Sequence, residues 1–160
     1  MKTIVLLRHS EAETKKTGMT DWDRNLTEAG TVLAKKSALA LKEHVQEVDL
    51  CVYSPAQRTR HTAEIFCSLL LCKDKLGEKA LYYNFDFDHF FDLIFALDDS
   101  ISTVLFVGHN PFITRISMYL TDKYDLFLHP ASFTVCRFDV NSWIEVNKGK
   151  LKDYAWVSSK

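Results

Sequence analysis

The chain has 160 residues, a length that fits one domain with a buried core, and we expect a single domain over residues 1–160. Its 20 basic and 21 acidic side chains leave a formal net charge of −1, which excludes an overall attraction to nucleic acid or to an anionic membrane surface. No apolar run is long enough to cross a bilayer or to act as a signal peptide, so we expect a cytoplasmic protein with free cysteine thiols. Because the net charge is close to zero, an anion-binding site would depend on a local group of basic side chains.

The first predicted element is a buried strand that ends in an arginine and a histidine. Residues 4–7 are consecutive apolar residues, a pattern typical of a parallel strand covered on both faces. Arg8 and His9 follow directly. Because open α/β sheets bind ligands beyond the carboxyl ends of their strands, a site is expected here. Residues 10–25 are polar and have no clear period, which predicts a loop beside that site.

A helix, a strand and a second helix are predicted next. Thr27 is a suitable N-cap for an amphipathic helix over about 28–45. Residues 49–53 predict the second strand. The pair Ser54-Pro55 combines a capping hydroxyl with a proline suited to the first helical position, and predicts a helix over about 56–71.

The middle of the chain repeats this alternation. Residues 73–79 predict a charged turn and residues 80–83 a short strand. Apolar residues recur at helical spacing over about 86–97, which predicts a third helix. Residues 103–107 predict another buried strand, and the segment Gly108-His109-Asn110-Pro111 predicts the start of a helix that continues to about residue 120.

The C-terminal part of the chain no longer alternates strands with helices. Residues 132–140 and 143–147 predict a hairpin around Asn141-Ser142, with a last short strand near 154–157. Alternating strands and helices before this tail indicate a largely parallel sheet. We therefore expect an α/β fold, a three-layer α/β/α sandwich with a mostly parallel central sheet and an antiparallel C-terminal edge.

Similar side chains follow three of the predicted strands. Arg8 and His9 end the first strand, Arg58 lies in the first turn of the helix after the second, and His109 follows the strand over 103–107. Taken singly, Arg58 fits an ordinary surface residue and His109 a loop residue, and two histidines also suit a metal. The two arginines argue against a metal because a dication would repel them. Since these motifs fix no carboxylate at the site, the four basic side chains are suited to bind an anion with several oxygens, such as phosphate.

Longer motifs around these residues resemble the histidine phosphatase superfamily. They are Arg8-His9, then Ser54-Pro55-x-x-Arg58-Thr59-x-x-Thr62-Ala63, then Gly108-His109-Asn110-Pro111. The segment Asp23-Arg24-Asn25-Leu26-Thr27-x-x-Gly30, together with Leu81-Tyr82, is similar to the SixA-like phosphohistidine phosphatases of this family. The resemblance covers roughly residues 3–121. Many members have glycine in place of Ser10 and glutamine in place of His61, and these departures affect only neighbouring contacts.

The resemblance implies a role for each residue. His9 would attack phosphorus and become phosphohistidine, which water then hydrolyses. Arg8, Arg58 and His109 would hold the phosphoryl oxygens and neutralise their charge, and Arg24 would add a weaker contact from the loop. Such a mechanism needs no metal and no cofactor.

A leaving-group acid cannot be identified from the sequence. Phosphomonoesterases of this superfamily use a carboxylic acid to protonate the departing alkoxide. Glu78, Asp86 and Asp88 lie in the appropriate part of the chain, but no motif selects one of them. The residues between Ala63 and Gly108 are also too few for an insertion that would cover a small metabolite.

The leading hypothesis is therefore a phosphohistidine phosphatase of a signalling system. Its substrate would be a histidine-phosphorylated carrier or phosphotransfer protein, and we expect the enzyme to be a monomer. A small-molecule phosphomonoesterase or phosphoglycerate-mutase-like enzyme is the alternative. A phosphate-binding module without catalysis is the third hypothesis, but such a module would be expected to lack His9 or His109.

Overall fold

The computed structural model describes residues 1–83 and 85–160, and it contains a six-stranded sheet. The strands are β1 (Lys2–Arg8), β2 (Glu47–Tyr53), β3 (Leu71–Gly77), β4 (Thr103–Gly108), β5 (Phe133–Phe138) and β6 (Leu151–Val157). Their order across the sheet is β3-β2-β4-β1-β5-β6. The first four in this order are parallel, whereas β5 is antiparallel to β1 and β6 is antiparallel to β5. The expected parallel sheet with an antiparallel C-terminal edge is confirmed.

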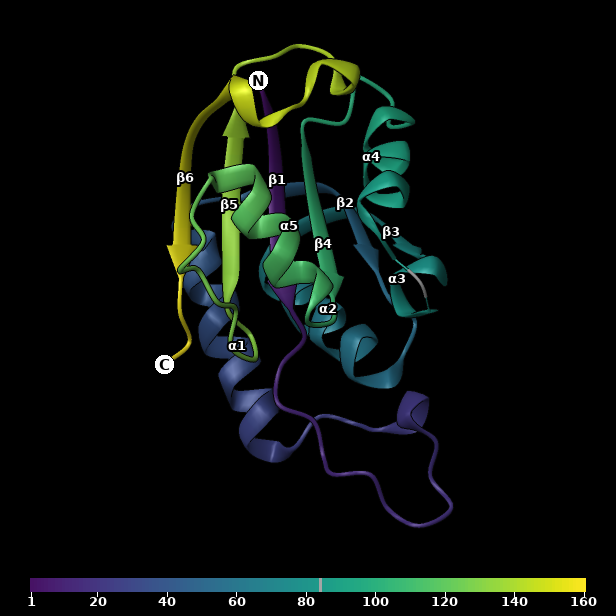
Figure 1. Ribbon diagram of the computed structural model, residues 1–160. Coiled ribbons are helices and arrows are strands. Elements are labelled where there is room, and N and C mark those ends of the chain that lie inside the picture. The colour runs from purple at the N-terminus through teal and green to yellow at the C-terminus, as the bar shows by residue number, and fades with distance from the viewer. Residues whose placement is uncertain (84) are drawn as a thin grey trace.

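Helices cover both faces of this sheet (Figure 1). They are α1 (Glu28–Lys42), α2 (Gln57–Leu69), α3 (Ala80–Tyr83), α4 (Phe87–Phe95) and α5 (Phe112–Thr121), with short 3-10 helices η1 (Asp21–Asp23), η2 (Trp143–Glu145) and η3 (Lys148–Lys150). One apolar core includes Leu41 of α1 and Phe66 of α2, and a second core includes Phe90 of α4 and Ile116 of α5. The expected three layers are therefore present. Within the described ranges, no helix has the length and apolar character needed to cross a membrane.

The register of the central strands brings three chain segments together. β1 pairs with β4 so that Arg8 lies opposite Gly108, and β2 pairs with β4 so that Tyr53 lies opposite Val107. The backbone continues this pairing beyond Arg8, because the N–H of His9 donates to the carbonyl of Gly108 at 3.1 Å. The residues that follow these strands therefore meet at one edge of the sheet, the lower edge in Figure 1.

The region between the second and third long helices differs from the prediction. Residues 71–77 form β3 where a charged turn was expected over 73–79, and residues 80–83 form the helix α3 where a strand was expected. β3 is an edge strand whose only partner in the described sheet is β2, so its side chains are mostly exposed and its sequence shows no apolar alternation. In α3, Leu81 is buried in the core next to α4 and α5.

The tail forms a hairpin, but with a different second strand. β5 pairs with β6 at residues 151–157, whereas the expected strand over 143–147 contains η2. Trp143 is the reason: its side chain is fully buried, and its indole N–H donates to the carbonyl of Ile101 at 2.9 Å. Trp143 and Val146 therefore pack around a 3-10 turn against the end of the core instead of extending along the sheet, while Ile144 between them is exposed.

The polar loop after β1 is attached to the start of α1. Thr27 caps this helix, because its hydroxyl accepts from the N–H of Gly30 at 2.8 Å, as the sequence predicted. Ser10 is buried and donates to the carbonyl of Gly30 at 2.6 Å. A Cβ on Gly30 would lie 2.1 Å from the carbonyl oxygen of Glu11, so only glycine permits this close approach.

Candidate active site

The predicted nucleophile His9 lies at the end of β1 in a defined tautomer. Its Nδ1 is 2.7 Å from the carbonyl oxygen of Ser10. A carbonyl only accepts hydrogen bonds, so Nδ1 carries the proton and the lone pair of Nε2 is available. Burial lowers the pKa of His9 to about 3, and the nearby charges of His109, Arg58 and Arg8 act in the same direction. The imidazole is therefore neutral near neutral pH, the state that a nucleophile requires.

His109 lies beside His9, with 5.2 Å between the ring centroids, and it has the opposite tautomer. Arg58 contacts its Nδ1 at 3.3 Å, and Ser54 contacts its Nε2 at 2.8 Å. Because arginine only donates, Nδ1 accepts and Nε2–H donates to the Ser54 hydroxyl. Burial lowers the pKa of His109 to about 4, and the charge of Arg58 adds to this effect.

Ser54 does not have the capping role that its sequence suggested. The N-cap of α2 is Ala56, without a side-chain hydrogen bond, and Pro55 precedes that cap. The hydroxyl of Ser54 instead accepts from Nε2–H of His109, which follows the neighbouring strand β4. Pro111 was likewise expected at the first helical position of α5, but it is the N-cap residue, and the helix begins at Phe112. The Asn110–Pro111 peptide bond is cis.

The two arginines expected to bind phosphate face the same space from different elements. Arg8 ends β1 and donates through Nη1 to the carbonyl of Leu128 at 3.0 Å. Arg58 lies in the first turn of α2, and only 5% of its surface is exposed. Both Nε atoms are buried without a hydrogen-bond partner among the described residues, so each guanidinium retains capacity for an anionic ligand.

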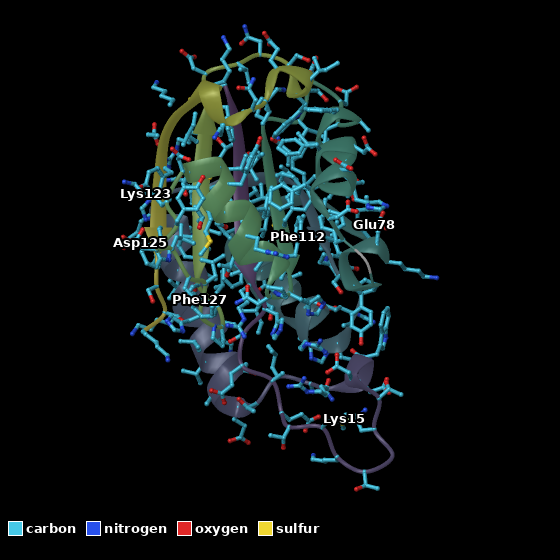
Figure 2. All side chains as sticks on the ribbon, viewed as in Figure 1. Lys15, Glu78, Phe112, Lys123, Asp125 and Phe127 are labelled. Carbon is cyan, nitrogen blue, oxygen red and sulfur yellow. The ribbon has the colours of Figure 1, made fainter. Side chains whose placement is uncertain are left out.

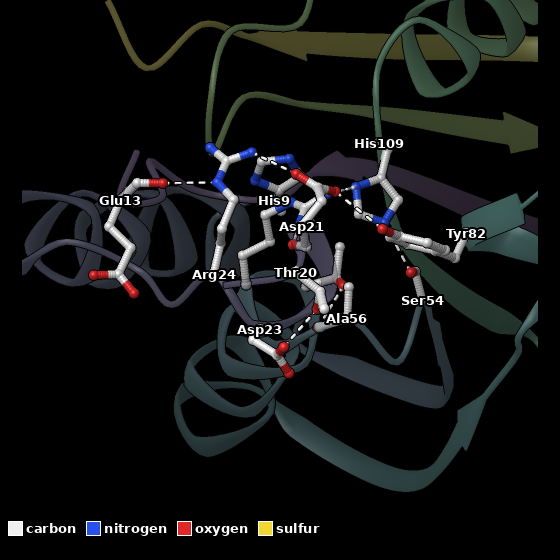
Figure 3. Close-up of polar contacts among 12 residues, drawn as sticks. His9, Glu13, Thr20, Asp21, Asp23, Arg24, Ser54, Ala56, Tyr82 and His109 are labelled. Atoms are coloured by element: carbon white, nitrogen blue, oxygen red, sulfur yellow. Dashed lines mark hydrogen bonds and ion pairs between the residues drawn. The ribbon is translucent and has the colours of Figure 1, made fainter. Parts of the chain in front are cut away.

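A carboxylate from outside the strand-end motifs lies among these cationic side chains. Asp21 of η1 accepts from Arg58 Nη2 at 2.8 Å, from Arg24 Nη1 at 2.8 Å and from the Tyr82 hydroxyl at 3.0 Å (Figure 3). Its backbone carbonyl also accepts from Arg58 Nη1 at 2.6 Å. Partial burial raises the pKa of Asp21, but these hydrogen bonds outweigh it and hold the pKa well below its usual range. The carboxylate is therefore ionised.

These side chains line one cavity of about 520 Å³, which we call the anion cavity. Its lining residues are Arg8, His9, Asp21, Arg24, Arg58, Tyr82, His109 and Asn110. All of the predicted site residues are therefore brought together, including Arg24, which is also fixed by the bond from its Nε to the carbonyl of Glu13 at 2.7 Å. Tyr82 and Asp21 are additions that the sequence did not indicate.

The loop after β1 forms one wall of the anion cavity, through Asp21 and Arg24. Trp22 packs edge-on against Tyr82 with 4.9 Å between the ring centroids, and its neighbour Asp21 points into the cavity. This loop contains the labelled Lys15 in Figure 2. The loop that the sequence predicted beside the site over residues 10–25 therefore contributes directly to it.

The three candidate acids lie elsewhere. Glu78 accepts from the N–H of Ala80 at 2.9 Å and lies beside α3 and α4, away from the Lys15 loop (Figure 2). Asp86 caps α4, and hydrogen bonds from His89 lower the pKa of its carboxyl. Asp88 is exposed on α4. None of the three lines the anion cavity, and in the described part of the chain no group of three or more His, Cys, Asp or Glu side chains could hold a metal ion.

Comparison with known proteins agrees with the family resemblance. Residues 4–78 match the model of the histidine phosphatase superfamily (branch 1). The fold is similar to SixA from Agrobacterium tumefaciens, with a TM-score of 0.77, 25% identity and coverage of 96% of this chain and 97% of that one. SixA from Nakamurella multipartitia gives a TM-score of 0.78 at 26% identity, covering 96% and 95% of the two chains.

A third solved structure shows the same fold. The protein histidine phosphatase SixA complexed with tungstate has a TM-score of 0.75 and 20% identity, with coverage of 86% of this chain and 88% of that one. No curated protein is similar enough in sequence to count as a match.

Proposed function

We propose that the chain is a phosphohistidine phosphatase of the histidine phosphatase superfamily, whose model matches residues 4–78, and that it acts through a phosphohistidine intermediate on His9. The observation that carries this proposal is the state of His9. Its Nδ1 proton is held by the carbonyl of Ser10, so its Nε2 lone pair is free in a cavity lined by arginines. A neutral imidazole at the floor of an anion-binding cavity can attack phosphorus without prior deprotonation.

The proposed first step transfers the phosphoryl group to this nitrogen. A bond forms between His9 Nε2 and phosphorus while the bond between phosphorus and the leaving atom of the substrate breaks. Arg8 and Arg58 hold the non-bridging oxygens and stabilise their charge. The negative charge of the phosphoryl group favours the imidazolium form of His109, whose Nδ1–H would donate to a phosphoryl oxygen while its Nε2–H stays on Ser54. In the second step, water attacks phosphorus and His9 is released.

The absence of a suitable acid supports phosphohistidine as the substrate. Among the described residues that line the anion cavity, the carboxyl group is that of Asp21, and its lowered pKa makes it a poor proton donor. An alkoxide leaves slowly without a proton, whereas phosphohistidine takes its proton from solvent, since a free histidine has a pKa of about 6.5. The named activity of the SixA relatives agrees with this choice.

We further propose that the substrate is a histidine-phosphorylated carrier or phosphotransfer protein and that the enzyme works as a cytoplasmic monomer in signal transduction. Contacts with an intact protein would contribute to transition-state binding in addition to those with the phosphoryl group. The phosphoprotein should therefore react faster than free phosphohistidine.

The alternative is a small-molecule phosphomonoesterase, and one observation favours it. A second cavity of about 270 Å³ shares Tyr82, His109 and Asn110 with the anion cavity and is lined by Asp86 as well. The carboxyl group of Asp86 would have to lose its hydrogen bonds from His89 before it could donate a proton.

One experiment separates the two functions. The kcat/KM of the purified protein is measured for a phosphohistidine-bearing carrier domain, free phosphohistidine, a sugar phosphate and phosphoglycerate. The proposal requires the carrier domain to react fastest and the phosphomonoesters slowest. If a sugar phosphate or phosphoglycerate reacts fastest, the enzyme is a phosphomonoesterase and Asp86 becomes the first candidate for its acid.

A further inference from the structure

Asp21 places a negative charge inside a cavity that is otherwise suited to bind one. Three donors from three elements hold its carboxylate: Arg24 beside η1, Arg58 of α2 and Tyr82 of α3. Its side chain is 42% exposed, whereas that of Arg58 is 7% exposed. The carboxylate therefore lies at the mouth of the cavity and the guanidinium of Arg58 lies deeper.

A phosphoryl group that takes a hydrogen bond from Arg58 Nη2, the guanidinium atom that also contacts His109, replaces this carboxylate there. Arg24 and Tyr82 are separate donors, so they can still hold the carboxylate at the mouth after Arg58 has changed partner. The phosphoryl group then lies deep, near His9, and the leaving group faces the mouth, because attack and departure occur on opposite sides of phosphorus. Asp21 is therefore placed beside the leaving group.

A carboxylate in this position affects two kinds of substrate differently. The bridging oxygen of a phosphomonoester has no proton to donate, so it gains nothing from a carboxylate, while the anionic phosphoryl group is repelled by it. The imidazole of phosphohistidine has a second ring nitrogen that carries a proton and a positive charge when it is protonated. This N–H can donate to a carboxylate in a charge-assisted hydrogen bond.

We propose that Asp21 is a specificity-determining residue, whose carboxylate accepts a hydrogen bond from the protonated second ring nitrogen of the substrate phosphohistidine. This inference rests on the proposed function. The proton comes from solvent, the bond between phosphorus and nitrogen breaks with its electron pair going to the ring, and neutral imidazole departs with the remaining N–H. Asp21 stays ionised throughout and gives up no proton.

The test compares two substrates in matched variants. The kcat/KM for free phosphohistidine and for p-nitrophenyl phosphate is measured in the unaltered protein, in Asp21→Asn and in Asp23→Asn. Asp23 is an exposed carboxylate of the same short helix that accepts a hydrogen bond from Thr20, so it controls for the loss of one negative charge. The measured quantity is the kcat/KM for phosphohistidine divided by that for p-nitrophenyl phosphate. We expect Asp21→Asn to lower this ratio by roughly 10- to 100-fold, the factor for one hydrogen bond to a charged group, and Asp23→Asn to leave it unchanged.

The pH profile gives a second readout. Asp21 stabilises the imidazolium of the substrate and so raises its pKa in the complex, and activity persists to higher pH in the unaltered protein. In Asp21→Asn, the alkaline limb for phosphohistidine should shift to lower pH, while the profile for p-nitrophenyl phosphate should keep its alkaline limb. Asp21→Glu, which keeps the charge, should restore part of the ratio.

The outcomes are distinguishable. If Asp21→Asn changes both substrates by the same factor, Asp21 only competes with the phosphoryl group for Arg58, and the inference is wrong while the proposed function stands. If the unaltered protein does not hydrolyse phosphohistidine, the proposed function fails and the inference fails with it. Circular dichroism of each variant establishes that a lost activity is not lost folding.

Discussion

The hydroxyl of Ser54 lies 2.8 Å from Nε2 of His109, and this contact links the residues that follow the paired strands β2 and β4. Ser54 is fully buried, so its hydroxyl is an integral part of the site. We expect Ser54→Ala to lower kcat/KM by about 10-fold, because the ring of His109 loses the partner that fixes its tautomer. Steady-state kinetics check this, with Ser68→Ala as the control, since that serine is exposed and donates to the carbonyl of Ile65 in its own helix. An unchanged kcat/KM in Ser54→Ala would show that the contact does not orient His109.

Replacement of His9 should abolish the phosphoenzyme. Rapid trapping with labelled substrate should give a labelled protein whose phosphoryl group is lost in acid and retained in base, the behaviour of a bond between phosphorus and nitrogen. His9→Ala should show no label, whereas His89→Ala should label normally, because His89 is exposed on α4. Labelling of His9→Ala would place the nucleophile elsewhere.

Activity should be independent of metal ions. The side chains around the anion cavity are mainly cationic or neutral, and a dication there would be repelled by Arg8 and Arg58. The kcat/KM should therefore remain the same after exhaustive chelation and after addition of zinc or magnesium. Loss of activity on chelation, with recovery on adding one of these metals, would make His9 and His109 metal ligands instead.

The buried histidines should make the protein sensitive to mild acid. Burial lowers the pKa of His9 to about 3 and that of His109 to about 4, both below the value of about 6.5 expected in the unfolded chain. As pH falls below 6.5, the unfolded chain binds protons that the folded protein does not, so stability is complete above this pH and is lost progressively below it.

Urea unfolding at pH 7 and pH 5 measures this effect. Each buried histidine should contribute up to about 1.4 kcal/mol of lost unfolding free energy per pH unit in this range. His9→Gln should lose less stability between the two pH values than the unaltered protein, whereas His89→Gln should lose the same amount. Equal losses in all three proteins would show that His9 titrates normally in the folded state.

The parts of the fold that were predictable are those with strong local patterns. The buried strands β1, β2 and β4 are apolar runs, and the helices α1, α4 and α5 show helical spacing or a clear cap, so their positions followed from the sequence. β3 was missed because an exposed edge strand needs no apolar residues. α3 was assigned as a strand because four residues are too few to show a period.

The candidate site divides in the same way. Arg8, His9, Arg58 and His109 follow buried strands, so the sheet topology alone brings them together. Asp21 had no such signal, since it is one of several carboxylates in a polar loop and its position depends on how that loop folds back. Tyr82 was missed because its direction depends on the helical turn of α3.

The attachments of the loop determine whether the cavity can open. The base of the loop cannot move away from the helix without losing the contacts of Gly30 with Ser10 and Glu11. The segment around Asp21 is held separately, by the hydroxyl of Tyr82 and by the packing of Trp22 on the same ring. A phosphate ion that takes Arg58 Nη2 from Asp21 leaves both of these attachments in place. Substrate binding would therefore exchange one hydrogen bond without opening the loop, and inorganic phosphate should not increase cleavage by trypsin at Lys15 and Lys16.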